Sequence, residues 1–405
     1  MSICEVNPQK CMGCYLCADV CGSHAIHMIQ NREGFFYPQI DKAKCTECGA
    51  CEKKCPALTE NGVPLGKCSL SGVIPEAYAV KCTDDQIRFK SASGGVFPLL
   101  ARNVLSEGGT VFGAAFTDAG KVSHRAIYRQ DELVQLQSSK YAQSDMTGIY
   151  RQVNQMLREG TKVLFSGTPC QAAALYNYLG KNLPDNLILV DLFCHGISSP
   201  GLLEQYLREI TDSRPIHAIS FRHKEHGWEK YNMHIEYGET VYSKSFQKDP
   251  FLAAFCTKSS LRESCYCCHA KGFPRHSDLT LGDFWMVDRV FPKMNAKKGV
   301  SIVLANTEKG KKILSKVFDL CEIRKIPESV FLDIYAKSGT PVARPSSRDH
   351  FFELAKQGTV ALASHHMCRQ PVKAAVIRNV RMIMVKFGIY EQMRTLKKRI
   401  QKNGE

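Results

Sequence analysis

Two runs of cysteines near the N-terminus have the spacing of iron–sulfur ligands. Both follow C-x2-C-x2-C-x3-C, and their members are Cys11, Cys14, Cys17, Cys21, Cys45, Cys48, Cys51 and Cys55. Three thiolates on one tight turn bind three irons of a cubane, and the fourth cysteine begins a short helix that reaches the other cluster. We therefore expect one [4Fe–4S] cluster to be held by Cys11, Cys14, Cys17 and Cys55. The second is expected to be held by Cys21, Cys45, Cys48 and Cys51.

A pair of zinc sites is the alternative for these eight cysteines. Zinc needs four ligands and is typically bound by pairs of cysteines, so two runs of four with this spacing disfavour it. Between the runs, segments 25–29 and 34–40 predict a small hairpin packed over the clusters. Pro56 follows the second run, whereas Gly22 stands at the corresponding place after the first. In these motifs residues 4–58 resemble a bacterial two-cluster ferredoxin.

A third group of cysteines lies in the rest of the chain. The stretch SCYCCH at 264–269 has a C-x2-C pair with Cys267 inside it. Together with two cysteines that each follow an apolar segment, the pair makes four thiolates. We predict a third [4Fe–4S] cluster held by Cys170, Cys194, Cys265 and Cys268. Two alternatives stay open. In one, Cys267 is a ligand in place of a neighbouring cysteine, and in the other the four cysteines bind a zinc ion.

The elements expected around Cys170 and Cys194 would bring these two residues together. Segments 161–180 and 186–210 each read as a buried strand, a turn and a helix. Successive units of this kind place their turns on one edge of a sheet, where α/β proteins bind ligands. Each cysteine alone would more often be a small buried apolar residue.

A Ser-Gly-Gly loop begins the helix that is expected within 91–109. Backbone N–H groups at such a helix start can approach a pyrophosphate, and the helix dipole favours the negative charge. A simple turn is the commoner role of a glycine pair. A strand is expected over 77–83 and a hairpin over 110–129. The polar segment 136–145 reads on composition as a surface loop.

Six motifs in order along the chain resemble the beta subunits of coenzyme F420 hydrogenases and dehydrogenases. They are SASGGVF, SSKYAQS, LFSGTPCQ, DLFCHG, FRHKEHGW and SCYCCHAKGFPRHSDLTLGDFW. The superfamily also contains 7-hydroxymethyl chlorophyll a reductases. The resemblance covers roughly residues 76–335 and departs from the family pattern at His223, where the family has an acidic residue.

This resemblance implies an FAD-binding α/β core that carries its own [4Fe–4S] cluster. It implies that the FAD phosphates are held by Ser93, Gly94 and Gly95. It implies that the flavin is lined by Lys140, Tyr141 and Ser144. The region between flavin and cluster would be closed by Asp283 and Phe284.

The predicted fold is α+β and multidomain. A two-cluster ferredoxin-like domain over 1–58 is followed by a linker over 59–75. The flavin-binding α/β core with a mixed sheet has an N-terminal part over 76–160. Its C-terminal part, over 161–345, carries the third cluster. A basic helical tail over 346–405 ends the chain.

The combination of clusters and flavin predicts an oxidoreductase. A flavin exchanges electron pairs as hydride and also single electrons, whereas a [4Fe–4S] cluster carries one electron at a time. We predict an enzyme that moves electrons between a two-electron carrier, reduced deazaflavin coenzyme F420 or NAD(P)H, and ferredoxin-type partners. One alternative is a ferredoxin-dependent reductase of a small organic substrate at FAD. Another is an electron-transfer subunit of a larger hydrogenase or dehydrogenase complex.

Reduction of a carbon centre would also need a proton donor. The candidates are His195, His223, Lys224 and Lys230. His195 comes first because it adjoins Cys194. A hydrogen bond from His195 to the cluster or to backbone is the favoured alternative role.

The charge and composition of the chain limit the kinds of partner that it can have. The net charge is +15, and residues 369–405 hold ten Lys and Arg against two Glu, so more than half of the excess lies there. The rest is too mildly basic for a nucleic-acid domain. No apolar run approaches the length of about 20 residues that spans a membrane. The 19 cysteines, with no export signal in view, indicate metal ligands in a reducing cytoplasm. Apolar and basic residues alternate at helical spacing over 376–400, which predicts packing on the core, with contact to a partner or membrane surface as the alternative.

Overall fold

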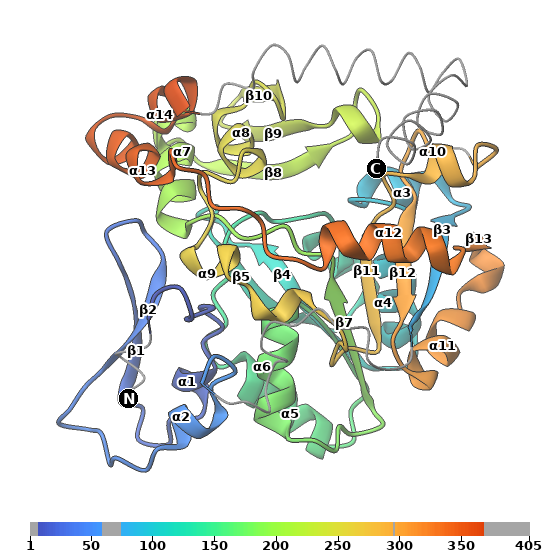
Figure 1. Cartoon of the computed structure of the whole chain (residues 1–405), viewed down its shortest axis with the longest axis horizontal. Helices are drawn as coiled ribbons and strands as arrows, with labels where there is room; N and C mark the ends of the chain where they lie inside the picture. The colour runs from blue at the N-terminus through green and yellow to red at the C-terminus, as the bar shows by residue number, and fades with distance from the viewer. Residues whose placement is uncertain (1–6, 59–73, 295, 368–405) are drawn as a thin grey trace, which may run out of the picture.

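The computed structural model describes residues 7–58, 74–294 and 296–367, and Figure 1 shows their arrangement. The N-terminal unit contains α1 (Leu16–Asp19), β1 (Ile26–Gln30), β2 (Phe36–Ile40) and α2 (Ala50–Lys54). Strands β1 and β2 pair antiparallel with Ile26 opposite Ile40, so the predicted hairpin is present. Helices α1 and α2 contact α5 (Ile149–Arg158) and α6 (Pro169–Leu179) of the core.

A mixed sheet forms the centre of the core. In the described part of the chain it has eight strands in the order β13-β3-β12-β11-β7-β6-β4-β5. They are β3 (Glu76–Cys82), β4 (Thr110–Phe116), β5 (Val122–Ile127), β6 (Val163–Ser166), β7 (Leu187–Leu192), β11 (Leu279–Asp283), β12 (Ser301–Ala305) and β13 (Cys321–Lys325). Strands β4, β6, β7 and β11 run parallel, and the other neighbours pair antiparallel. The parallel strands therefore end at one edge, where the turns after β6 and β7 lie.

The turns that carry Cys170 and Cys194 are set by the strands and helices around them. Strands β6 and β7 are apolar and almost wholly buried, as in parallel strands covered on both faces. Helix α6 begins with Pro169, and Thr168 and Gln171 form a capping box. Helix α7 (Pro200–Thr211) begins after Ser199, whose hydroxyl accepts from the Leu202 N–H. Both helix starts are thus fixed directly beside the cysteine turns.

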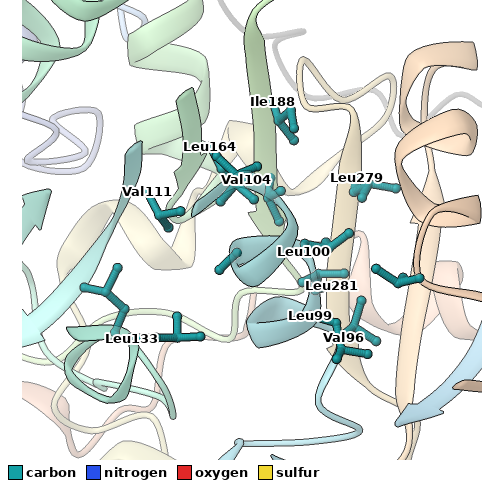
Figure 2. Packing of buried hydrophobic residues seen from close by; sticks show 14 of the residues in the cluster. Val96, Leu99, Leu100, Val104, Val111, Leu133, Leu164, Ile188, Leu279 and Leu281 are labelled. Carbon is teal, nitrogen blue, oxygen red and sulfur yellow. The ribbon is translucent and has the colours of Figure 1, made fainter. Parts of the chain in front are cut away.

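Helices cover both faces of the sheet. Figure 2 shows α4 (Val96–Ser106) on one face, where its apolar side chains pack against Val111, Leu164, Ile188, Leu279 and Leu281 from four parallel strands. On the other face, α5 and α6 pack on the sheet through residues such as Tyr150 and Leu175. Each of these fully buried side chains contributes about 1.5–3 kcal/mol.

A second, smaller sheet adjoins α7. Its strands are β8 (Ile216–His223), β9 (Asn232–Tyr237) and β10 (Thr240–Ser245), in the order β10-β9-β8. Its apolar face packs in one cluster with α7, α8 (Pro250–Cys256), α13 (Arg348–Gln357) and α14 (Val360–Met367). This sheet was not predicted from the sequence. The remaining helices are α3 (Asp85–Lys90), α9 (Glu263–Tyr266), α10 (Val287–Val290), α11 (Glu308–Ser315) and α12 (Glu328–Ser338).

The α+β multidomain class is confirmed, and so are the strands and helices expected within 77–129, 161–180 and 186–210. The Ser-Gly-Gly loop begins its helix as expected, since α4 starts at Val96 and Gly95 is its left-handed cap with φ 87°. The predicted linker, over 59–73, and the predicted basic tail, from residue 368, lie outside the described residues. Among those described, no helix is long and apolar enough to cross a membrane.

Candidate functional site: two cysteine-lined cavities

The first cavity lies in the N-terminal unit and is lined by four of the predicted ligands. They are Cys11, Cys14, Cys17 and Cys55. Gly13 and Tyr15, with φ of 62° and 67°, curl the chain around the cavity ahead of α1. Burial raises the pKa of the Cys14 thiol well above its usual value, and the neighbouring thiols of Cys55 and Cys17 raise it further. We call this cavity the first site.

The other four N-terminal cysteines lie toward the outside of the same unit. Cys48 is exposed, whereas Cys21 and Cys51 are half-buried in one apolar cluster. Burial raises the pKa of Cys51, and the charges of Glu52 and Cys21 add to this. Cys45 lies just beyond β2, where its N–H donates to the Asp41 carbonyl at 3.1 Å. We call this group the second site.

The second cavity lies in the core at the edge where the parallel strands end. Its lining includes Cys170, Cys194, Cys265 and Cys268. Cys170 lies in the first turn of α6, Cys194 follows β7, and the other two lie in and after α9. Burial raises the pKa of Cys170 to about 12, and the thiols of Cys268 and Cys194 add to the effect. We call this cavity the third site.

Four buried thiols that face one another do not ionise easily, because each negative charge disfavours the next. A metal centre reduces this conflict, since coordination deprotonates the thiols and the metal offsets part of their negative charge. Cys267 is exposed and does not line the cavity. The structure thus brings together the four predicted residues and leaves Cys267 outside.

The described cysteine sulfurs are not gathered closely around a single point. Among residues 7–58, 74–294 and 296–367, no three cysteine sulfurs lie within 4.8 Å of one another. Four sulfurs around one zinc ion lie only about 3.8 Å apart, since the tetrahedral Zn–S bonds are about 2.3 Å long. A [4Fe–4S] cubane binds its four thiolates at four separate irons, so it does not require sulfurs gathered around one ion.

Met12 lies between the first and third sites. Its side chain is buried, at 7% exposure, and it lines both cavities. It packs with Cys170 and Cys268 of the third site and with Ala57, which lines the first. Met12 therefore borders both cysteine cavities. No sequence pattern indicates this role, because it depends on how the N-terminal unit meets the core.

Hydrogen bonds fix the cysteine loops of the N-terminal unit to the core. The Tyr150 hydroxyl donates to the Cys14 carbonyl at 2.8 Å. The buried Asp19 carboxylate accepts from the N–H groups of Gly148 and Tyr150 at 2.8 and 2.9 Å. Lys54 and Asn177 exchange two bonds between α2 and α6. The two units thus form one docked body.

Arg262 makes the most direct link from the core to a predicted ligand. Its Nε donates to the Cys11 carbonyl at 2.9 Å, and its Nη2 lies 3.5 Å from the Cys11 Sγ. This residue was not among those predicted from the sequence. The sequence shows only that Arg262 lies three residues before Cys265, a predicted ligand of the third site. Nothing in this spacing indicates that Arg262 contacts the first site.

The loop predicted to hold the FAD phosphates is wedged between two strands. The Gly94 N–H donates to the Ser301 hydroxyl at 2.9 Å, and the Ser93 hydroxyl donates to the Val300 carbonyl at 2.9 Å. A Cβ on Gly94 would lie 2.3 Å from the Val80 carbonyl oxygen. The close approach of the strands by itself accounts for this glycine. Gly95 caps α4.

Two residues predicted to line the flavin are also engaged within the protein. The Lys140 amine donates to the carbonyls of Gln135 and Gln137 at 3.0 and 2.7 Å, and burial lowers its pKa to about 7. The Ser144 hydroxyl is buried 2.8 Å from both the His124 Nδ1 and the Gln171 Nε2. Ser144 therefore braces the start of α6 beside Cys170.

Tyr141 and Asp283 meet at a buried arginine that was not predicted from the sequence. Nη1 of Arg222 donates to the Asp283 carboxylate at 2.5 Å and to the Tyr141 hydroxyl at 3.4 Å. Arg222 is 4% exposed, and its Nε and Nη2 have no hydrogen-bond partner among the described residues. The guanidinium lies over the ring of Tyr231 at 4.6 Å and over that of Trp285, which is 52% exposed, at 5.3 Å. Phe284 points instead into the core.

The orphaned donors of Arg222 fit a ligand with acceptor atoms. A buried guanidinium with unused N–H groups is costly unless a partner supplies the missing hydrogen bonds. The ring edge of a flavin carries carbonyl and nitrogen acceptors of this kind. Tyr141 also stacks on Phe255, whose ring lies 5.1 Å from that of His195, next to Cys194. The Arg222 position thus connects to the third site through packed rings.

The candidate proton donors have different environments. Burial lowers the pKa of His195 to about 4, and its Nε2 is buried without a partner among the described residues. His223 stacks on His234 at 4.3 Å. The Lys224 amine donates to three backbone carbonyls at 2.7–3.0 Å, and burial lowers its pKa to about 7. Lys224 therefore acts as a clamp on the loop before α4. Lys230 ends a short 3-10 helix, on the surface.

Comparisons with known proteins agree with an iron–sulfur domain at the N-terminus. Residues 160–328 match the family described as the C terminus of the coenzyme F420 hydrogenase/dehydrogenase beta subunit. Residues 10–58 match the 4Fe-4S dicluster domain. The chain is therefore an iron–sulfur electron-transfer protein. Its N-terminal segment is similar to a 4Fe-4S dicluster domain, and a later segment is similar to the C-terminal domain of F420 hydrogenase/dehydrogenase beta subunits.

One solved structure with a similar chain is the F420-reducing [NiFe] hydrogenase complex from Methanosarcina barkeri. The two chains are 16% identical over 72% of this chain and 90% of that one, with a TM-score of 0.42. This score is too low to support any argument about function. No curated protein matches the chain.

Proposed function

We propose that this protein is an oxidoreductase with three [4Fe–4S] clusters that joins a two-electron carrier to one-electron partners. The observation that carries the proposal is the position of Met12, which lines both the first and the third cysteine cavity. A single side chain between two cluster sites is a short path for electrons. The third site therefore belongs to the same relay as the two N-terminal sites.

The third cluster is supported by the four thiols and their spacing. Cys170, Cys194, Cys265 and Cys268 line one cavity, and no three of their sulfurs lie within 4.8 Å of one another, whereas sulfurs around one zinc ion lie about 3.8 Å apart. Zinc has no redox chemistry, so a zinc site would interrupt the relay. A cubane at this position carries one electron at a time.

The positions of the three sites suggest a path for electrons between the core and the protein surface. The third site lies at the sheet edge, the first site follows across Met12, and the second site includes the exposed Cys48. A one-electron partner such as a ferredoxin would therefore dock at the outer side of the N-terminal unit. Residues such as Tyr150 and Asp19 hold the loops in register with the core while partners bind and leave.

An FAD is proposed on the core side of the third site. When bound, a flavin exchanges a hydride with a carrier and single electrons with a cluster. Arg222 would bind the acceptor atoms at the edge of the flavin ring through its Nε and Nη2 donors. Tyr141 and Asp283 would hold the guanidinium in place. Given the family match, reduced coenzyme F420 and NAD(P)H are the carriers to test.

The test begins with anaerobic purification and assay of flavin, followed by mixing with reduced F420 or NADPH. We expect one FAD per chain, lost or weakly held in Arg222→Gln, and bleaching of cluster absorbance with one of the two donors. Arg129→Gln is the control, because that arginine is exposed on the surface and pairs with Asp131. A protein that binds no flavin after reconstitution, or accepts electrons from neither donor, would contradict the FAD part of the proposal.

A second candidate is a subunit of a larger hydrogenase or dehydrogenase complex. The matched family is described by its beta subunits, which favours this candidate. Trp285, whose ring lies 5.3 Å from the Arg222 guanidinium, and Phe89, whose ring lies 6.0 Å from that of His223, are 52% and 39% exposed, as at a surface that meets a partner. Purification of the tagged chain from its native host would decide: a stoichiometric redox partner supports a complex, and activity without one supports a free-standing enzyme.

A further inference from the structure

Arg262 reaches from the core into the N-terminal unit and contacts a predicted ligand of the first site. Its Nε donates to the Cys11 carbonyl at 2.9 Å, and its Nη2 lies 3.5 Å from the Cys11 sulfur. The guanidinium lies over the ring of Tyr37, 4.0 Å from its centroid, and a further bond goes to Gln143 at 3.2 Å. Arg262 is thus held in one position by groups from both units.

The charge of Arg262 needs compensation that its protein contacts do not supply. The residue is 0% exposed, and in the described part of the chain its guanidinium contacts neutral groups and the Cys11 thiol. Burying an unpaired charge is costly. A [4Fe–4S] centre with four thiolate ligands is anionic, so the cluster at the first site would supply the missing counter-charge.

Building on the proposed function, we propose that Arg262 raises the reduction potential of the cluster held by Cys11, Cys14, Cys17 and Cys55. Reduction adds one negative charge to the cluster. A fixed positive charge and an N–H donor at a ligand sulfur stabilise the reduced form more than the oxidised form. The first cluster would then accept electrons readily from the third site across Met12. Arg262 is a positioning and tuning residue, since it acts through Cys11.

The test is a redox titration of the full chain followed by EPR, for the wild type and for Arg262→Gln. Loss of a charge-assisted bond shifts the reduction equilibrium by about tenfold, which is 59 mV for a one-electron couple. One cluster should become harder to reduce by this amount, while the other midpoints stay unchanged. Arg262→Lys keeps the charge and should show a smaller shift.

Arg348→Gln is the matched control. Arg348 is also a fully buried core arginine that binds the N-terminal unit, but its partner there is Glu33 rather than a cysteine. Its substitution should leave all midpoints in place. Unchanged midpoints in Arg262→Gln, or an equal shift in Arg348→Gln, would overturn the tuning role.

A second measurement does not depend on any variant. Wild-type protein labelled with 15N-arginine should show a nitrogen coupling in the pulsed EPR of a reduced cluster, and no such coupling would overturn the proposal. The tuning role and the proposed function fail separately. A wild type without iron at the N-terminal sites contradicts the proposed function, whereas clusters with no 15N coupling and no shift contradict only the role of Arg262.

Discussion

Arg348 binds both oxygens of the Glu33 carboxylate, at 2.7 and 2.8 Å, across the boundary between the core and the N-terminal unit. The arginine side chain is 0% exposed and Glu33 is 24% exposed. Geometry of this kind, with two parallel bonds and little water, is the strong form of an ion pair. It ties the tip of the β1–β2 hairpin to the core.

Glu33→Gln should therefore lower the free energy of unfolding by about 1.5–3 kcal/mol. The loss is limited because Arg348 keeps a second carboxylate, Glu263, at 2.8 Å. Chemical denaturation of the holoprotein measures the change. Asp333→Asn is the control, since it removes an exposed pair with Lys337 that contributes less than about 0.5 kcal/mol. Equal effects of the two substitutions would show that the Glu33 pair does not help to dock the units.

The hairpin also approaches the start of α7 at backbone distance. A Cβ on Gly34 would lie 2.6 Å from the Cα of Gly201, and Gly34 has φ 78°. Gly34→Ala should cost about 2–4 kcal/mol, from left-handed strain together with overpacking. Gly108→Ala is the matched control, because its φ is 74° and nothing lies within 4 Å of the added Cβ. Thermal unfolding compares the two. A Gly34→Ala effect no larger than that of Gly108→Ala would contradict the close approach.

Stability should fall in mild acid because of His124. Burial lowers its pKa from 6.5 to about 4, and the neutral ring lies between the Ser144 hydroxyl at 2.8 Å and the Ser166 carbonyl at 3.1 Å. The unfolded chain binds a proton near pH 6.5 while the folded chain does not. The contribution of His124 is therefore complete above about pH 6.5 and is lost as the pH falls toward 4, by at most about 3 kcal/mol.

Denaturation at pH 7 and pH 5 measures this effect, with His124→Gln as the comparison. The variant should be less stable at pH 7 and should lose less on going to pH 5, because it cannot take up the proton. If both proteins lose the same free energy over this range, the acid sensitivity comes from other groups.

The placement of two cysteines at the sheet edge was predictable because it depends only on short segments of sequence. Apolar runs over 163–166 and 187–192, each followed by a turn and a Pro-led helix, are sufficient to place Cys170 and Cys194 at neighbouring strand ends. The N-terminal hairpin was also predicted correctly from short segments of sequence. The small sheet was missed because β8 and β10 show no regular alternation of buried and exposed residues.

Other features depend on contacts that no local pattern records. Met12 and Arg262 gain their positions only when the N-terminal unit docks on the core. The Ser-Gly-Gly loop shows the opposite problem, since its glycine pattern suits a phosphate site and equally suits the close approach to Val80 and Ser301 that the structure contains. Sequence alone does not separate the two causes.

A third cluster in the core, next to the N-terminal pair, is the central claim. Its most direct test is the iron and sulfide content of anaerobically reconstituted protein, together with EPR of the reduced state. Three [4Fe–4S] clusters correspond to about twelve irons per chain in the wild type. Cys170→Ala and Cys194→Ala should each retain about eight, with the N-terminal signals intact, because their ligands lie in a separate unit.

Cys267→Ala is the matched control, since this cysteine is exposed and lies outside the cavity. We predict that this variant keeps all of the iron of the wild type. Full iron in Cys170→Ala or Cys194→Ala, loss of a cluster in Cys267→Ala, or zinc in place of iron at the third site would contradict the claim.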